Sequence, residues 1–108
     1  MRYSVYIHGG ILLLDFANKG TKDIFECVSS KESRKTLPVN LHKIAKRKLD
    51  QLAYAEEIKD LKWPPGNKLE KLKGDYDGFY SIRINDQWRV VFEWIRSGPK
   101  NIEIVDYH

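Results

Sequence analysis

The 108-residue chain contains one cysteine, Cys27, so it forms no internal disulfide and fits a reducing compartment. The residues around Cys27 predict a buried helical thiol rather than a nucleophile. The three histidines, His8, His42 and His108, lack the close spacing of an ordinary zinc site, and we expect neither a metal nor a cofactor. No apolar run approaches the roughly 20 residues of a membrane-spanning helix, so we expect no membrane partner. These absences predict a cytoplasmic protein whose chemistry comes from its own side chains.

The residues that are present indicate one globular domain spanning residues 1–108. The chain is 42% hydrophobic and 31% charged, which disfavours intrinsic disorder. Nineteen lysines and arginines stand against fifteen aspartates and glutamates, which gives a formal net charge of +4. A basic surface favours a polyanionic partner such as RNA, although many basic proteins bind no nucleic acid.

The clearest pattern is an alternation of apolar and polar residues over 79–94, which predicts an antiparallel hairpin with its turn at 85–87. A two-residue loop would mix apolar and charged groups on both faces. A three-residue loop pairs Ile84 with Trp88 and gives one wholly apolar face, so we predict that register. The other face then carries Ser81, Arg83, Arg89 and Glu93. Two guanidinium groups so close together predict an anionic ligand, or a carboxylate partner such as Glu93.

The N-terminal part predicts one central strand and an uncertain extension before it. Residues 3–7 alternate like a strand and break at Gly9 and Gly10, which fits an edge strand, a disordered leader or added residues. We expect residues 1–10 to carry no function. The apolar run 11–16 suits a central strand, and residues 18–20 give a turn signal.

Two helices are predicted next, with a polar loop at 29–36 between them that exposes Arg34 and Lys35. Thr21 and Asn40 are the candidate N-caps. We expect Ile24, Phe25 and Val28 of the first helix to face inward. In the second helix, apolar residues recur at helical spacing at Leu41, Ile44, Ala45, Leu49 and Leu52. Its other side carries Lys43, Lys46 and Arg47, which is either a solvated face or an RNA contact.

The remaining residues predict antiparallel strands. Pro64 and Pro65 end any helix before them. Residues 68–73 read as a strand, 74–78 as a turn, and 101–105 as a last strand after a turn at 97–100. The order favours an α+β fold, in which two N-terminal helices pack on one face of a twisted, mainly antiparallel sheet.

The exposed face of this sheet is the candidate site. It would collect Lys71 or Lys73, Arg83, Arg89 and the C-terminal residues Asp106, Tyr107 and His108. Such side chains suit RNA cleavage without a metal, in which a base removes the 2′-hydroxyl proton, cations stabilise the phosphate and an acid protonates the leaving oxygen. His108 suits either proton-transfer role, and Tyr107 could stack on a base or position the phosphate. A terminal histidine and sheet arginines also occur without any catalytic role.

These residues resemble the HigB-type toxins of the RelE superfamily, which belong to bacterial type II toxin-antitoxin systems and to the plasmid maintenance killer family. The resemblance rests on residues 64–70, the Leu-Lys-Gly-Asp turn at 72–75, the hairpin 80–89 and the ending 103–108. It implies a RelE-like fold and a metal-independent endoribonuclease that cuts mRNA on the 70S ribosome in the bacterial cytoplasm and inhibits growth. It also implies a helix-turn-helix antitoxin of the HigA type, with operator DNA contacted only through that antitoxin. Carried over by position, the phosphate-binding cations are Lys73 and Arg89, and the acid-base group is Asp106, Tyr107 and His108.

The sequence departs from the family pattern in two places. Some members have a histidine where this chain has Glu70, so the assignment of base and acid among Glu70, Asp106 and His108 stays open. Family members usually begin near Leu13, which leaves residues 1–10 as an extension. The alternative to an enzyme is a non-catalytic module that binds RNA or the ribosome through Lys43, Lys46, Arg47 and the sheet arginines. Lys71 and Arg83 are further candidate RNA contacts, and no recognition helix for DNA is evident.

Overall fold

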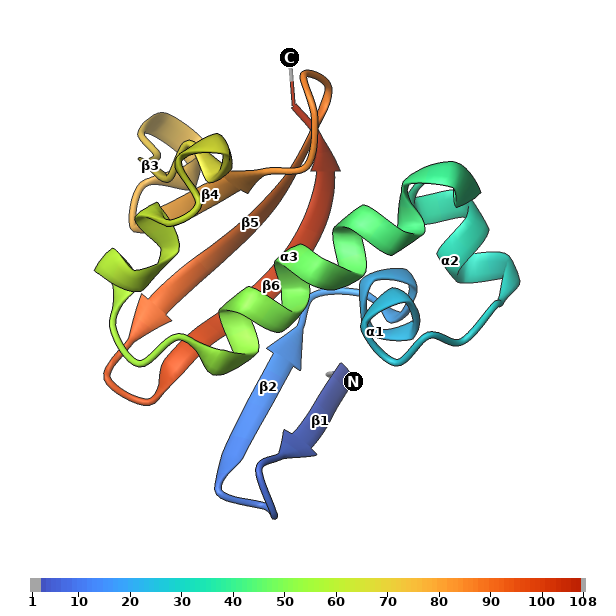
Figure 1. Cartoon of the computed structure of the whole chain (residues 1–108), viewed down its shortest axis with the longest axis horizontal. Coiled ribbons are helices and arrows are strands. Elements are labelled where there is room, and N and C mark those ends of the chain that lie inside the picture. The colour runs from blue at the N-terminus through green and yellow to red at the C-terminus, as the bar shows by residue number, and fades with distance from the viewer. Residues whose placement is uncertain (1–2, 108) are drawn as a thin grey trace.

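The computed structural model describes residues 3–107, whose strands form one six-stranded sheet in the order β1-β2-β6-β5-β4-β3 (Figure 1). Strands β2 and β6 run parallel and every other neighbouring pair runs antiparallel, so the predicted α+β class and mainly antiparallel sheet are confirmed. None of the helices in this described part of the chain is long and apolar enough to cross a membrane. The strands are β1 (Tyr3–Ile7), β2 (Leu12–Phe16), β3 (Glu70–Lys71), β4 (Phe79–Arg83), β5 (Trp88–Ile95) and β6 (Gly98–Asp106).

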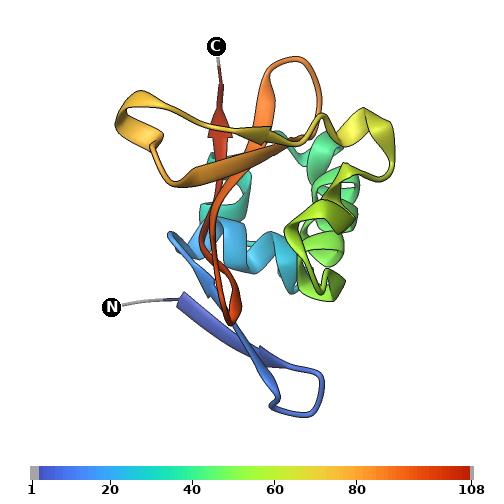
Figure 2. The same ribbon diagram turned by 90° about the vertical axis from the view of Figure 1, so that its left-hand side faces the viewer.

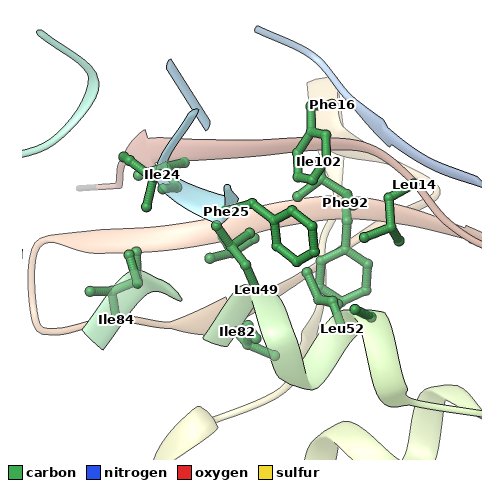
Figure 3. Packing of buried hydrophobic residues seen from close by; sticks show 14 of the residues in the cluster. Leu14, Phe16, Ile24, Phe25, Leu49, Leu52, Ile82, Ile84, Phe92 and Ile102 are labelled. Carbon is green, nitrogen blue, oxygen red and sulfur yellow. The ribbon is translucent and has the colours of Figure 1, made fainter. Parts of the chain in front are cut away.

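Within the same residues, three α-helices and four short 3₁₀ turns connect the strands. The α-helices are α1 (Lys19–Phe25), α2 (Lys31–Thr36) and α3 (His42–Tyr54), and the 3₁₀ turns are η1 (Val39–Leu41), η2 (Ile58–Lys62), η3 (Pro65–Asn67) and η4 (Gly74–Tyr76). Helix α3 covers one face of the sheet, because its buried Leu49 and Leu52 pack in the same cluster as Ile82 and Phe92 of the hairpin (Figure 3). In Figure 2 the green helix α3 lies on one side of the orange and red strands β5 and β6. The other face of these strands carries the charged side chains.

The predicted hairpin register is confirmed. Ile82 lies opposite Val90, Tyr80 lies opposite Phe92, and the amide of Ile84 donates to the carbonyl of Trp88 at 2.9 Å. The side chain of Asn85 closes the turn, since its Oδ1 accepts the amides of Gln87 at 2.9 Å and Trp88 at 2.8 Å. The parity of a three-residue loop therefore decides which residues of β4 and β5 are buried and which form the charged face.

The predicted turn at 18–20 is wrong, because α1 begins at Lys19 and includes Gly20. The cap is Asn18 rather than Thr21: its Oδ1 accepts the amide of Thr21 at 2.8 Å, and Thr21 itself is buried. Gly20 serves a packing purpose here, since a Cβ at this position would lie 2.6 Å from the carbonyl oxygen of Glu32 in α2. The glycine lets α1 and α2 approach closely.

The predicted loop at 29–36 is also wrong. Ser30 and Ser33 form a reciprocal capping box that starts α2, although Arg34 and Lys35 are exposed as expected. Before this helix the chain turns at Cys27, which has a positive φ of 60°. Cys27 and Val28 are consequently exposed, and neither is the buried residue that the sequence predicts. The described residues thus contain three α-helices where we expected two.

Three further boundaries differ from expectation. Helix α3 begins at His42 after the η1 turn, and Asn40 does not cap it. Strand β6 begins at Gly98, because Ile95 already pairs with Gly98 across a two-residue turn. The strand expected over 68–73 is reduced to Glu70–Lys71. At the edge of the sheet opposite β3, strand β1 is an edge strand, and its Val5 and Ile7 pack against the core.

Candidate functional site

Arg89 lies at the centre of the charged face, with only 14% of its side chain exposed. Its Nη1 donates to Ser81 Oγ at 2.7 Å and to the carbonyl oxygen of Lys68 at 3.4 Å, and lies 3.2 Å from Glu70 Oε1. Ser81 is fully buried, and Glu70 lies opposite it on β3, so both acceptors are placed by the sheet ladder. Two strands and the turn before β3 therefore fix one edge of the guanidinium group.

The end of β6 supplies an aromatic face to the same guanidinium. The Arg89 Cζ lies 5.4 Å from the ring centroid of Tyr107, which is within the range of a cation–π contact. Tyr107 is held in register by its amide, which donates to the carbonyl of Gln87 at 2.8 Å. The hairpin turn thus positions the end of the chain over Arg89.

Arg83 lies directly opposite Arg89 across the β4–β5 ladder, as the loop parity predicts. Like charges in that position repel each other. Each arginine has its own carboxylate, since Arg89 pairs with Glu70 and Arg83 pairs with Asp86. Glu93 is not the partner, because its Oε1 accepts a hydrogen bond from Asn101 Nδ2. Carboxylates of the chain itself therefore neutralise part of the positive charge of the two arginines.

The second edge of the Arg89 guanidinium, formed by Nε and Nη2, has no acceptor among residues 3–107. All its hydrogen bonds within residues 3–107 use Nη1, which leaves Nε and Nη2 without a protein acceptor there. No buried side-chain nitrogen or oxygen in the described part of the chain lacks a partner, so these two atoms are not buried. Nε and Nη2 point their N–H groups in parallel, which is the geometry that binds two oxygens of a phosphate.

The other predicted site residues are only partly brought together. Lys71 lies opposite Tyr80, so strand alternation places it on the face opposite Glu70 and Arg89, which corrects its assignment to the charged face. Lys73 is exposed and precedes η4. Asp106 lies opposite Trp88, one residue out of phase with Tyr107, and its Oδ2 accepts from Gln87 Nε2 at 3.0 Å. His108 lies outside the described residues.

The cations of α3 are separate from this face. Helix α3 packs on the apolar side of the sheet, whereas Arg89 projects from the other side. Lys43 and Arg47 are exposed, but Lys46 is half-buried and already engaged. Its Nζ donates to the carbonyl of Phe25 at 2.7 Å and lies 2.8 Å from Asp50 Oδ1. The structure does not bring Lys43, Lys46 and Arg47 to Arg89.

Sequence reasoning missed Asn67, which anchors the segment that supplies acceptors to Arg89. This residue is fully buried at the end of η3, one position before Lys68. Its Oδ1 accepts from Lys48 Nζ at 2.5 Å, and its Nδ2 donates to Gln51 Oε1 at 2.8 Å. Burial lowers the pKa of Lys48, and the charge of Arg47 lowers it further. The Pro-Pro-Gly-Asn motif was a visible signal for this anchor.

Comparisons with known proteins show the family to which this chain belongs. A family model described as a RelE-like toxin of the type II toxin-antitoxin system HigB matches residues 14–108. The chain belongs to the HigB-like toxin family. Toxin HigB-1 of Vibrio cholerae is 33% identical over 84 residues, covering 78% of this chain and 85% of that protein. Endoribonuclease HigB of Proteus vulgaris is 30% identical over 97 residues, covering 90% of this chain and all of that protein.

A solved structure supports the fold of this HigB-like toxin. The YoeB-YefM complex from Staphylococcus aureus aligns with a TM-score of 0.58 at 23% identity, covering 90% of this chain and 97% of the matched chain. The family match includes β3, the hairpin and the C-terminal residues, and it begins after β1. Within residues 3–107, no group of three or more His, Cys, Asp or Glu side chains is placed to hold a metal ion.

Proposed function

We propose that this HigB-like toxin is a metal-independent endoribonuclease that cuts mRNA on the 70S ribosome and so stops growth. One observation carries the proposal: Arg89 has an open Nε/Nη2 edge beside Glu70 and Tyr107, on the face that α3 does not cover. The name of the Proteus vulgaris relative, an endoribonuclease, supports the same activity. We place the protein in the bacterial cytoplasm.

In the proposed reaction, the 2′-oxygen of RNA attacks the adjacent phosphorus and the 5′-oxygen leaves. Arg89 binds the non-bridging phosphate oxygens through its open edge and stabilises the charge that develops on them. Lys73 supplies a second cation, and Tyr107 stacks on a base or orients the phosphate. Glu70, Asp106 and His108 are the candidates for the general base and the general acid. Arg83 contacts the RNA outside the scissile linkage.

The proposed regulator is a helix-turn-helix antitoxin of the HigA type. Such a partner would keep the toxin inactive until it is released, and operator DNA would be contacted only through the antitoxin. The membership of this chain in a type II toxin family supports a protein partner of this class. The solved structure that shares the fold is itself a complex, that of YoeB with YefM, which supports the same class of partner.

Mapping of mRNA 5′ ends after brief induction tests the activity. We expect new 5′ ends within translated mRNA for the wild type and none for Arg89→Ala or for a stop codon at position 108. Arg89→Lys is the matched variant, because it keeps the charge and loses the two-donor edge. Persistent cleavage by the variant lacking His108 would contradict a catalytic role for that residue, and cleavage by Arg89→Ala would contradict the whole proposal.

The second candidate function is RNA or ribosome binding without cleavage. The exposure of Lys43 and Arg47 on α3, away from Arg89, favours it. This function predicts growth arrest without new mRNA ends, and toxicity that falls with the charge of α3 rather than with loss of Arg89. The same 5′-end mapping therefore separates the two candidates.

A further inference from the structure

Ser81 places a buried hydroxyl group beside Arg89 on the charged face. It lies on β4 opposite Val91 of β5, and both residues are buried. At a buried position in a sheet, β-branched and aromatic residues are favoured over serine. A buried hydroxyl also costs free energy unless it is hydrogen-bonded. The Oγ of Ser81 accepts from Arg89 Nη1 at 2.7 Å, and this contact accounts for a serine at the position.

The three acceptors around Arg89 Nη1 differ in how firmly they hold it. The Glu70 side chain is 53% exposed on the two-residue strand β3, and an exposed ion pair of this kind contributes little. The carbonyl oxygen of Lys68 lies at 3.4 Å, which is longer than an ordinary hydrogen bond. Ser81 offers the shortest contact, from a short side chain that is fully buried. Ser81 is therefore the acceptor that fixes the guanidinium group.

A neutral acceptor differs from a carboxylate when protons move in the site. The ion pair between Arg89 and Glu70 is lost when that carboxylate takes up a proton, because the charge on the acceptor disappears. The hydroxyl of Ser81 carries no charge in either case, so its contact with Nη1 persists. Because the guanidinium group is planar and rigid, a fixed Nη1 also fixes the direction of Nε and Nη2. The position of the open edge then does not depend on the charge of Glu70.

We infer that Ser81 is a positioning residue, whose hydroxyl holds the Arg89 guanidinium in place whatever the charge on Glu70. This role rests on the RNA cleavage proposed above. Ser81 is fully buried, so it acts through Arg89 rather than by touching the RNA. A phosphate would stay bound to Nε and Nη2 while a proton moves at Glu70. Without the hydroxyl, the guanidinium would follow the exposed Glu70 side chain and lose its orientation.

Nuclear magnetic resonance of arginine side chains tests the position of Arg89 without RNA. The heteronuclear NOE of the Arg89 Nε–Hε group, assigned by its loss in Arg89→Lys, reports the motion of the guanidinium in the full chain. We expect Ser81→Ala to lower this NOE. Glu70→Gln imitates the protonated carboxyl, and we expect it to leave the NOE near wild type. An NOE unchanged by Ser81→Ala, or lowered as much by Glu70→Gln alone, would overturn the inference.

Cleavage of mRNA on 70S ribosomes tests the consequence for the reaction. A displacement of about 1 Å in a group that stabilises the transition state can lower a rate on the order of 100-fold. We expect Ser81→Ala to lower kcat about tenfold to a hundredfold and to change KM less than about threefold, because the hydroxyl does not touch the RNA. Ser81→Thr keeps the hydroxyl and should retain most of kcat. Wild-type kcat in Ser81→Ala would contradict the positioning role.

Ser33→Ala is the matched control for the loss of a buried hydroxyl. Ser33 is also fully buried, and its hydroxyl serves the capping box of α2, which lies across the molecule from β4 (Figure 1). We expect this variant to be less stable but to keep the wild-type kcat and Arg89 NOE. Equal losses of kcat in Ser33→Ala and Ser81→Ala would assign the effect to stability and refute the role of Ser81. A wild-type chain that cuts no mRNA would refute the proposed endoribonuclease, and the NOE comparison would then decide alone whether Ser81 holds Arg89.

Discussion

Asn67→Ala tests whether a buried amide holds the segment that partners Arg89. The substitution removes four hydrogen bonds at once: one from Lys48, one to Gln51, and two to the carbonyls of Leu61 and Trp63 at 3.1 and 3.3 Å. These bonds join α3, η2 and the residue after η2 to the end of η3. Their loss would release the backbone just before Lys68, whose carbonyl accepts from Arg89.

The expected cost follows from the type of each bond. A hydrogen bond to a charged group contributes about 1.5–3 kcal/mol and a neutral one about 0.5–1.5 kcal/mol. The two N–H groups of Nδ2 are shared among three acceptors, so the lower part of the combined range applies. We expect Asn67→Ala to lower the free energy of unfolding by about 3–5 kcal/mol. Such a loss is a large part of the roughly 5–15 kcal/mol that stabilises a typical domain.

Urea unfolding followed by tryptophan fluorescence and far-ultraviolet circular dichroism measures this cost. Asn40→Ala is the matched control, because Asn40 is exposed and does not cap α3, and we expect it within about 0.5 kcal/mol of wild type. Asn67→Asp keeps an oxygen for Lys48 but loses the donor, so we expect it to be destabilised as well. A cost below about 1 kcal/mol for Asn67→Ala would refute the anchoring role.

Three further predictions concern the helices and the N-terminal strand. Gly20→Ala should destabilise the fold by about 1–3 kcal/mol in urea unfolding despite the better helix propensity of alanine, because its Cβ would overlap α2; equal or higher stability would show that α2 moves aside. Burial raises the pKa of Asp23, but hydrogen bonds from Lys19 and Ser30 outweigh it and leave that pKa below the ordinary 3.8. The Asp23 contribution is therefore present above pH 3.8 and lost as the pH falls through the lower folded pKa, so Asp23→Asn should flatten this acid loss in unfolding titrations. Removal of residues 1–10 should lower the melting temperature, because Val5 and Ile7 pack on the core, and should leave RNA cleavage intact; loss of cleavage in a folded truncated protein would contradict this.

The parts of the fold that the sequence predicts are those with a long periodic signal. Alternation along β4 and β5, together with loop parity, predicts both the buried face and the juxtaposition of Arg83 with Arg89. Helix α3 is predicted because its apolar positions repeat over several turns. Helix α2 has six residues and almost no apolar periodicity, and it depends on the Ser30–Ser33 capping box and on the close approach allowed by Gly20. Polar composition alone made that segment look like a loop.

From the sequence, only the part of the candidate site that lies on the β4–β5 hairpin could be predicted. The pairing of Glu70 with Arg89 requires the register of β3 against β4, and β3 is two residues long. The same register turns Lys71 away from Arg89, which the positions of the basic residues in the sequence do not reveal. The exposure of Cys27 depends on one residue with positive φ at the end of α1. Such short-range geometry is decided by tertiary contacts rather than by sequence pattern.

The arrangement around Arg89 constrains how an anion can bind. Its Nη1 is held by Ser81, Glu70 and the Lys68 carbonyl, so a phosphate that uses Nε and Nη2 need not displace Glu70. The phosphate and the Glu70 carboxylate would then lie on the same guanidinium, on the order of 6 Å apart, with a repulsion of about 1–3 kcal/mol at an effective dielectric constant between 20 and 80. Proton transfer to Glu70 would relieve that repulsion as negative charge accumulates on the phosphate. Arg89 would thus hold the phosphate beside Glu70, one of the three residues, with Asp106 and His108, that we propose as candidates for the general base and the general acid.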